Sequence, residues 1–239
     1  MDISTPVLDE FPLLKALQSE VVHCIRCSRL REYCTKVANE KRRAYREWVY
    51  WGRPVPAFGD PEARILIVGL APAAHGANRT GRMFTGDRSG MWLYRALYQV
   101  GLANQPDSVS RDDGLALTDA YISATVRCAP PDNKPLPEEI RNCRSYLDRE
   151  LKLLPNVRVV VALGKIAFDT YLDLLKLRGV IRSRASFAFG HNRQFRTGAG
   201  QPVLISSYHP SQQNTSTGKL TEGMLVAVFR RARKRVEQL

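Results

Sequence analysis

The chain has 239 residues, of which 44% are hydrophobic and 25% are charged, and this composition suits one large α/β domain with a sizeable core. Its formal net charge of +13 favours a polyanionic partner, most simply a nucleic acid; a protein that is merely basic is the alternative. No apolar run reaches the length of about 18 residues that a membrane span requires, so we expect no membrane contact. The first residues lack the basic start and apolar core of a secretory signal, so we expect a cytoplasmic protein without structural disulfides.

The segment before residue 57 is predicted to be helical and basic. Residues 1–20 are expected to form an arm with a short helix around residues 13–17. Glycine and proline are absent from Cys24 to Trp51, which allows further helices, and the stretch 52–56 ends them. Lys and Arg side chains are interleaved there with Tyr and Trp, which suits a surface that follows a nucleic-acid backbone. A solvated helix face is the alternative.

Four strands alternate with helices in the rest of the chain. Apolar runs predict the strands at 64–70, 121–127, 157–163 and 203–208. Helical patterns are found at 89–100, from 137 to 154, at 165–175 and at the C-terminus. The first and third runs lack the alternation of a half-exposed strand, which indicates strands covered on both faces. We therefore predict a single domain, 1–239, with a three-layer α/β/α fold around a central four-stranded parallel sheet, and with a helical N-terminal segment at about 20–56.

The unusual segments of the chain follow the predicted strands. A glycine-rich loop follows the first strand, a Cys-Pro-Asn loop at 128–135 follows the second, and a His-Pro-Ser loop at 209–218 follows the fourth. In open α/β sheets, ligands bind at the carboxyl edge, where such loops meet. The glycine spacing fits neither GxGxxG nor GxxxxGK(S/T), which disfavours a nucleotide cofactor.

The first of these loops combines side chains that suit a pocket for a flat polar group near phosphates. An ordinary surface loop is the alternative. The side chains are an acid, an aromatic ring, an amide and three guanidinium groups, contributed by Asp87, Phe84, Asn78, Arg79, Arg82 and Arg88.

Four of the five cysteines have a spacing that suits a metal centre. Cys24 and Cys27 form a CxxC pair, Cys128 lies in an irregular loop, and Cys143 follows fifteen residues later in a predicted helix. Four thiolates bind either a tetrahedral zinc ion or an iron–sulfur cluster, and the wide spacing of the second pair suits the larger group. Scattered buried cysteines are the alternative. Cys34 is expected to be a packed or partly exposed thiol rather than a ligand.

These residues together resemble the family 5 uracil-DNA glycosylases (the UDGb group) of the uracil-DNA glycosylase superfamily. The resemblance runs from about Cys24 to Leu220. Its specific motifs are Gly69-Leu70-Ala71-Pro72-Ala73-Ala74-His75-Gly76, Asn78-Arg79-Thr80-Gly81-Arg82, Phe84-Thr85-Gly86-Asp87, and His209-Pro210-Ser211 with Asn214 and Thr217-Gly218.

The resemblance implies a monofunctional DNA glycosylase. Such an enzyme flips a deaminated base out of DNA and hydrolyses its N-glycosidic bond with an activated water, which initiates base excision repair. Family 4 relatives carry a Glu where Leu70 and Ala71 stand, and an Asn that reads uracil where Ser123 and Ala124 stand. Both departures favour family 5, and they imply a broader choice of bases that includes hypoxanthine as well as uracil.

The resemblance also implies roles for individual residues. Asp87 would be the catalytic carboxylate, Asn133 would help it to position water, and His209 would stabilise the leaving base. The structural alternatives are a helix N-terminal acid, a turn Asn and a structural His. The implied substrate contacts are Gly69, Ala71, Phe84, Ser211 and Asn214. The implied cofactor is a structural 4Fe–4S cluster on Cys24, Cys27, Cys128 and Cys143.

Other functions compete with this interpretation. A strict uracil glycosylase of family 4 type is the nearest, and the residues at 70, 71 and 124 argue against it. A non-catalytic nucleic-acid-binding iron–sulfur protein would keep the cysteines and the basic surface but would not need Phe84, Asp87 and His209 together. A structural zinc protein is the third. For the favoured function we expect a monomer that acts on DNA containing deaminated bases and is associated with the nucleoid.

Overall fold

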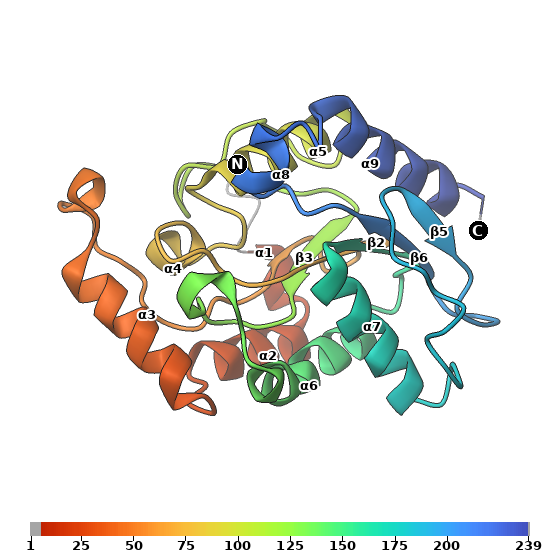
Figure 1. Ribbon diagram of the computed structural model, residues 1–239, viewed down its shortest axis with the longest axis horizontal. Coiled ribbons are helices and arrows are strands. Elements are labelled where there is room, and N and C mark those ends of the chain that lie inside the picture. Colours follow the sequence, from red (N-terminus) through yellow and green to blue (C-terminus); the bar gives the residue numbers. More distant parts are fainter. Residues whose placement is uncertain (1–5, 239) are drawn as a thin grey trace.

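The computed structural model describes residues 6–238, and a mixed sheet forms its middle layer (Figure 1). The strand order is β1-β3-β2-β4-β6-β5, and the four central strands pair in parallel. The predicted parallel sheet is therefore confirmed. The short antiparallel edge strands β1 and β5 were not predicted. The strands span β1 (Phe58–Gly59), β2 (Ile65–Gly69), β3 (Ala120–Ala124), β4 (Val159–Leu163), β5 (Arg193–Phe195) and β6 (Val203–Ser207).

Every residue of the four parallel strands is buried, because helices cover both faces of the sheet. Alternate residues serve the two faces: Ile65 and Ile67 pack into one core, and Leu66 and Val68 into the other. The first core is closed by α5 (Arg88–Gln99) and α9 (Glu222–Val236). The second is closed by α2 (Pro12–Val22), α6 (Pro137–Leu153) and α7 (Lys165–Leu177). This explains why the strands read as continuous apolar runs.

The N-terminal segment is helical, as predicted, and extends the helix expected around residues 13–17. It contains α1 (Pro6–Asp9), α2, α3 (Ser28–Glu40) and the 3₁₀ turn η1 (Arg43–Tyr45). Helix α3 lies at the side of the molecule in Figure 1. The first five residues of the predicted arm lie outside the described residues. Among residues 6–238, no helix combines the length and the apolar character that crossing a membrane requires.

Short helices interrupt the loops at the carboxyl edge of the sheet. They are α4 (Ala77–Thr80) after β2, the 3₁₀ turn η2 (Pro131–Asn133) after β3, and α8 (Gln212–Ser216) after β6. The predicted loop at 209–218 thus contains a helical turn. Ser211 caps this turn, and its Oγ accepts a hydrogen bond from the amide of Asn214 at 3.4 Å.

A buried ion pair joins the end of β3 to α6. The guanidinium of Arg127 donates to Glu150, and both side chains are almost completely buried, with exposed fractions of 1% and 0%. The hydroxyl of Ser123 on β3 donates to the same Glu150 oxygen at 2.7 Å and accepts from Arg127 at 2.8 Å. The pair therefore fixes the direction in which the chain leaves the sheet toward the loop after β3.

Loss of this pair is expected to destabilise the fold. Glu150→Gln should lower the free energy of unfolding by about 3–5 kcal/mol, because the charge of Arg127 then stays buried without its partner. Urea unfolding followed by circular dichroism measures the change. Glu20 is the matched control: its carboxylate pairs with Arg149 at the surface, so Glu20→Gln should cost about 0–1 kcal/mol. Equal losses in the two variants would contradict the prediction.

Candidate active site

The loop after β2 folds back over the end of its own strand. A Cβ atom added to Gly69, the last residue of β2, would lie 2.7 Å from two ring carbons of Phe84. The aromatic ring therefore lies directly against the strand backbone, where only glycine leaves room. Phe84 itself has a left-handed backbone, with φ of 52°, and its carbonyl oxygen presses against Gly90 in the same way. A strained non-glycine residue of this kind needs support from its surroundings and is common at functional sites.

Asp87 has two separate environments for its two carboxylate oxygens. It caps the N-terminus of α5, where Oδ1 accepts a hydrogen bond from the amide of Gly90 at 2.9 Å. Oδ2 points to Gly76, where an added Cβ would lie only 2.0 Å away. Burial raises the pKa of Asp87, while the amides of Gly90 and Ser89 and the charge of Arg79 act in the opposite direction. The alternative role of Asp87, an acid at the N-terminus of a helix, therefore applies to Oδ1, whereas Oδ2 takes no part in the cap.

Arg79 holds this loop together from inside. Its side chain is 3% exposed. Its Nε donates to the carbonyl oxygen of His75 at 2.8 Å, and its Nη2 donates to that of Gly86 at 2.9 Å. Its Cζ lies 3.9 Å from the ring centroid of Tyr45 and 4.1 Å from that of Trp48. Within residues 6–238 no carboxylate pairs with this guanidinium, and the two rings stabilise the buried cation instead.

The sequence predicted that polar side chains of this loop form a pocket near phosphates, and this prediction is wrong for three of them. Arg79 is engaged as described above. Asn78 is completely buried, and its Nδ2 donates to the carbonyl oxygens of Cys34 and Ala74 at 3.3 Å. Arg82 forms a bidentate pair with Asp113, with both distances 2.8 Å. These side chains build the loop, so they cannot reach a phosphate outside it.

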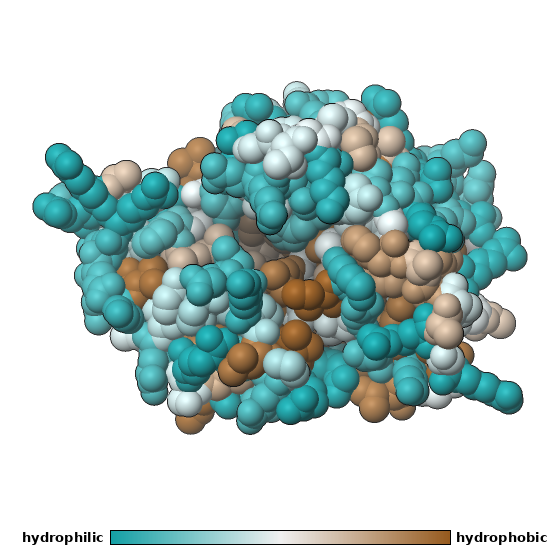
Figure 2. All heavy atoms as spheres, viewed as in Figure 1, coloured by the Kyte–Doolittle hydropathy of each residue, from teal (hydrophilic) through white to brown (hydrophobic). Residues whose placement is uncertain are grey.

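His209 approaches Phe84 from β6. Its ring centroid lies 5.9 Å from that of Phe84, with the planes inclined by 31°. Gly164, which precedes α7 with φ of 96°, allows the approach, because a Cβ there would lie 3.3 Å from the Cβ of His209. Burial lowers the pKa of His209 to about 4, so the imidazole is neutral at neutral pH. Figure 2 shows a hollow in the face of the molecule that Figure 1 presents, with hydrophobic residues in its depth and hydrophilic residues around it.

Ser211 and Asn214 order the segment that carries His209. Ser211 caps α8, as described above, and the Nδ2 of Asn214 donates to the carbonyl oxygen of His209 at 2.9 Å. Gln212 and Gln213, at the start of α8, are exposed. The structure therefore links Asn214 to His209 and shows a local structural role for both predicted contact residues.

Asn133 and Ala71 are not joined to the other predicted site residues by hydrogen bonds. Asn133 ends the η2 turn at the carboxyl edge with φ of 56°, and its side chain is exposed. Because this side chain is exposed, its amide can be reached by water or substrate. Ala71 is half-buried and packs against the group that contains Leu17, Val21 and Cys143. The structure brings together Gly69, Phe84 and His209, and sets Asp87 against Gly76.

Sequence reasoning did not identify the supporting residues Arg79, Tyr45, Trp48 and Gly164 as a set. The sequence signal was present for Tyr45 and Trp48, because aromatic residues are interleaved with cations before residue 52. It was interpreted as an outward nucleic-acid surface. No local pattern shows that an arginine 31 residues after Trp48 inserts between these rings.

The four predicted ligand cysteines line one narrow cavity of about 10 Å³, between the N-terminal segment and the loop after β3. The Sγ of Cys27 accepts a hydrogen bond from Asn142 at 3.6 Å. Cys34 is completely buried beside Cys128 and is not part of this lining. In the described part of the chain, no three His, Cys, Asp or Glu residues are arranged to hold a single metal ion. Four thiols that line one cavity supply the ligand number of a zinc ion or of an iron–sulfur cluster.

Two arginines lie beside the four thiols of this cavity, and the charge of one of them, Arg127, is already balanced by Glu150. Arg31 and Arg127 both line it. The Nη1 atoms of both side chains are buried and have no hydrogen-bond partner in residues 6–238. Burial raises the pKa of the Cys143 thiol to about 12, so its deprotonation requires a compensating positive group. The residues present therefore fit an iron–sulfur cluster.

The fold and the site define an α/β enzyme whose substrate carries a flat ring. A parallel sheet presents an aromatic ring, a neutral imidazole and a partly buried acid at its carboxyl edge, which is the binding edge of such folds. The chain matches the Uracil DNA glycosylase superfamily over residues 56–233, and it belongs to that superfamily.

Several curated relatives are similar over most of the chain. A Type-5 uracil-DNA glycosylase from Thermus thermophilus is 48% identical over 220 residues, which cover 92% of this chain and 97% of the relative. One from Mycobacterium bovis is 50% identical over 212 residues, covering 88% of this chain and 77% of the relative. A Type-4 enzyme from Archaeoglobus fulgidus is 31% identical over 159 residues, covering 66% of this chain and 70% of the relative. The predicted resemblance to family 5 is confirmed.

The charge of Arg79 is expected to keep Asp87 ionisable. Arg79→Met should raise the pKa of Asp87 further above its ordinary value, because the positive charge that favours the carboxylate is removed. Carbon-detected NMR titration of the Asp87 carboxyl measures the shift. Arg79→Lys keeps the charge and should restore most of the lowering. Arg88→Met removes an exposed cation next to Asp87 in the chain and should change the pKa little. An unchanged pKa in Arg79→Met would refute the role.

Proposed function

We propose that the protein removes uracil from DNA by hydrolysing the N-glycosidic bond, as the first step of base excision repair. The Type-5 relatives, at 48–50% identity, support this activity. The observation that carries the proposal is the Phe84 ring held over Gly69 and facing a neutral His209. A flat ring beside a neutral donor is what a flipped base with carbonyl oxygens needs.

Phe84 supplies a stacking surface for the flipped base. The backbone of Gly69 fixes one side of this ring, so the ring loses little conformational entropy when a base binds. His209 stands at an inclined angle to it. As a neutral imidazole it donates one N–H to a base carbonyl oxygen, where negative charge develops as the bond to the sugar breaks.

Asp87 acts on the sugar side of the bond. The transition state of glycoside hydrolysis carries positive charge on the sugar, which a carboxylate stabilises. Its Oδ2 is not used by the helix cap. Asn133, with its exposed amide at the same edge of the sheet, assists Asp87 in positioning the attacking water. Because the pKa of Asp87 is raised, the rate should fall as the pH is lowered through that pKa.

We further infer that hypoxanthine is a substrate. In family 4 an Asn at the end of β3 reads uracil, and Ser123 and Ala124 stand here instead. The hydroxyl of Ser123 is bound within the Arg127–Glu150 pair, and Ala124 has no polar side chain. Neither side chain can form hydrogen bonds with the edge of a base, so the choice of base depends on stacking and on His209. Such a pocket accepts more than one deaminated base.

We also infer a structural 4Fe–4S cluster on Cys24, Cys27, Cys128 and Cys143. The shared cavity and the unpaired buried guanidinium nitrogens of Arg31 and Arg127 support it. When bound, the cluster supplies a covalent link between the N-terminal helices and the loop after β3. The protein's own residues carry out the reaction, and we propose that it works as a monomer on DNA in the nucleoid.

Single-turnover excision tests the proposed function. Duplexes with uracil or hypoxanthine opposite guanine, treated with alkali after reaction, should break at the modified base, and an unmodified duplex should not. Asp87→Asn should lower the rate by about 100-fold or more with little change in DNA affinity, because it removes the negative charge but no packing. Absence of cleavage by the wild-type protein would overturn the proposal, and cleavage at uracil alone would remove hypoxanthine from it.

A glycine variant provides a control that leaves every functional group in place. Gly76→Ala adds a methyl group at 2.0 Å from Asp87 Oδ2, so the carboxylate must move and the rate should fall. Gly223→Ala adds the same group where no atom lies within 4 Å, and should keep the wild-type rate. Equal rates in the two variants would show that the position of Asp87 is not important for the reaction.

Colour tests the cluster. The purified protein should be brown and absorb in the blue region, and Cys128→Ser should lose the colour and unfold more easily. Cys34→Ser is the matched control, since Cys34 is buried beside Cys128 but does not line the cavity. A coloured, stable Cys128→Ser variant would exclude Cys128 as a ligand. Stoichiometric zinc in a colourless wild-type protein would replace the cluster by a zinc site.

A further inference from the structure

A groove opens at the edge of the sheet opposite the candidate active site. It has a volume of about 820 Å³ and is lined by the starts of β4 and β6, by the loop 197–202 and by three arginines, Arg158, Arg196 and Arg235. The parallel strands begin here and end at the site of Phe84 and His209. Figure 1 shows β5 and the C-terminus on this side of the molecule, away from α4 and α8.

The cations of the groove have no acidic partners. Within residues 6–238, none of Arg158, Arg196 and Arg235 forms an ion pair, and no acidic side chain lines the groove. The Nε of Arg235 is buried without a hydrogen-bond partner in the described residues. The neighbouring surface of α9 adds Arg230, Arg231 and Lys234, all exposed, beside one acid, Glu237, which pairs with Arg233. A surface with this excess of cations favours an anion.

The loop between β5 and β6 adds backbone donors to these cations. Gly198, Ala199 and Gly200 are exposed, and their amides donate no hydrogen bond to any described residue. Gly200 has φ of 68°, and an atom added at its Cβ would meet nothing within 4 Å. Free amides on a left-handed turn form a concave anion site in many proteins. Amides and guanidinium groups together match the oxygens of a phosphate.

We propose that this groove binds the phosphate backbone of a second DNA segment. The cations extend along α9 beyond the space that one phosphate occupies, which favours a polyanion over a free ion. The strand β6, which separates the groove from the active site, is five residues long and spans about 17 Å. The groove and the active site open at opposite ends of the parallel strands, with the protein between them, so a straight duplex that lies across one end does not enter the other. The DNA in the groove is therefore a different segment from the one whose base is excised. This activity goes beyond base removal: the protein bridges two DNA segments.

A bridging assay tests this inference. Two abasic-site duplexes, one with a donor and one with an acceptor fluorophore, are mixed with the full-length protein, and energy transfer reports their joining. The wild-type protein should join them. Arg158→Ala combined with Arg196→Ala should weaken binding of the second duplex by about tenfold or more, and should lower the salt slope of that binding by about two. Excision of uracil from a short duplex should stay at the wild-type rate, because neither residue lies at the catalytic edge.

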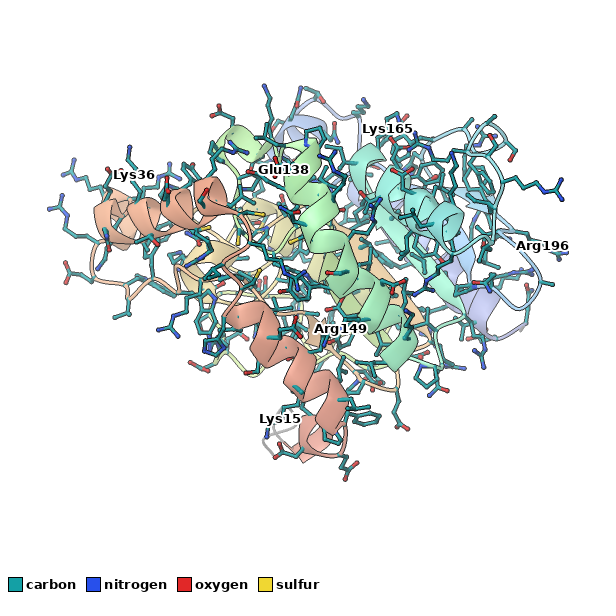
Figure 3. All side chains as sticks on the ribbon, turned by 90° about the horizontal axis from the view of Figure 1, so that it is seen from below. Lys15, Lys36, Glu138, Arg149, Lys165 and Arg196 are labelled. Carbon is teal, nitrogen blue, oxygen red and sulfur yellow. The ribbon has the colours of Figure 1, made fainter. Side chains whose placement is uncertain are left out.

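The matched control removes two cations from another face. Lys15 and Arg149 lie on the helical layer shown in Figure 3, apart from Arg196. Lys15→Ala combined with Arg149→Ala lowers the net charge equally and should keep the bridging. Equal bridging in both double variants, or none in the wild-type protein, would overturn the inference. Inorganic phosphate is the second probe: amide NMR shifts at Gly198 and Gly200 without any bridging would make the groove a small-anion site and would also overturn it. Excision activity is measured separately, so failure of bridging leaves the proposed function standing.

Discussion

The sharp return of the loop after β2 is the constraint on which the candidate site depends. Phe84 must lie on Gly69, and Asp87 must lie against Gly76, and neither approach leaves space for a Cβ atom. A loop that packs so closely buries its own polar groups, and Arg79 satisfies two of its carbonyl oxygens from inside. Tyr45 and Trp48 stabilise the guanidinium in place of a direct carboxylate partner. As a result Asp87 feels the charge of Arg79 without being neutralised by a salt bridge.

This arrangement sets two opposite pKa shifts within one site. Burial raises the pKa of Asp87, and the amides of Gly90 and Ser89 together with the charge of Arg79 limit the rise. Burial also lowers the pKa of His209 to about 4. Near neutral pH the site therefore holds an ionisable acid and a neutral imidazole. The carboxylate stabilises the positive charge that develops on the sugar, and the imidazole stabilises the negative charge that develops on the departing base. The same desolvation produces both effects, because it disfavours whichever form of a group is charged.

The sequence specified the central sheet well and the interior of the loops poorly. Continuous apolar runs such as 157–163 predicted buried parallel strands, because covered strands have no polar face. The edge strands were missed since β1 has two residues and β5 has two exposed residues among its three. Phe84, Asp87 and His209 were found through motifs. The interior roles of Asn78, Arg79 and Arg82 were not, because a polar side chain in a glycine-rich stretch does not show in sequence whether it points inward or outward.

The loop after β3 connects the cysteine cavity with the catalytic edge. Cys128 lines the cavity, and Asn133 stands at the tip of the same loop, five residues later. Left-handed backbones at Asp132 and Asn133 and the prolines around them leave this loop few alternative conformations. A group that fixes Cys128 therefore also fixes the position of the Asn133 amide. This gives a structural reason for the proposed cluster beside a site whose proposed chemistry does not use it.

The net charge of the chain overstates the surface that is available to DNA. Three of the arginines are buried. Arg79 donates to backbone carbonyl oxygens, Arg82 pairs with Asp113, and Arg127 pairs with Glu150. These arginines have structural roles, and their charge is screened from a phosphate by the protein around them. The outward cations are distributed unevenly: some lie on the N-terminal helices, and others surround the groove at the amino ends of β4 and β6. A single contact surface at the catalytic edge would leave the second group without a role, whereas two DNA segments account for both.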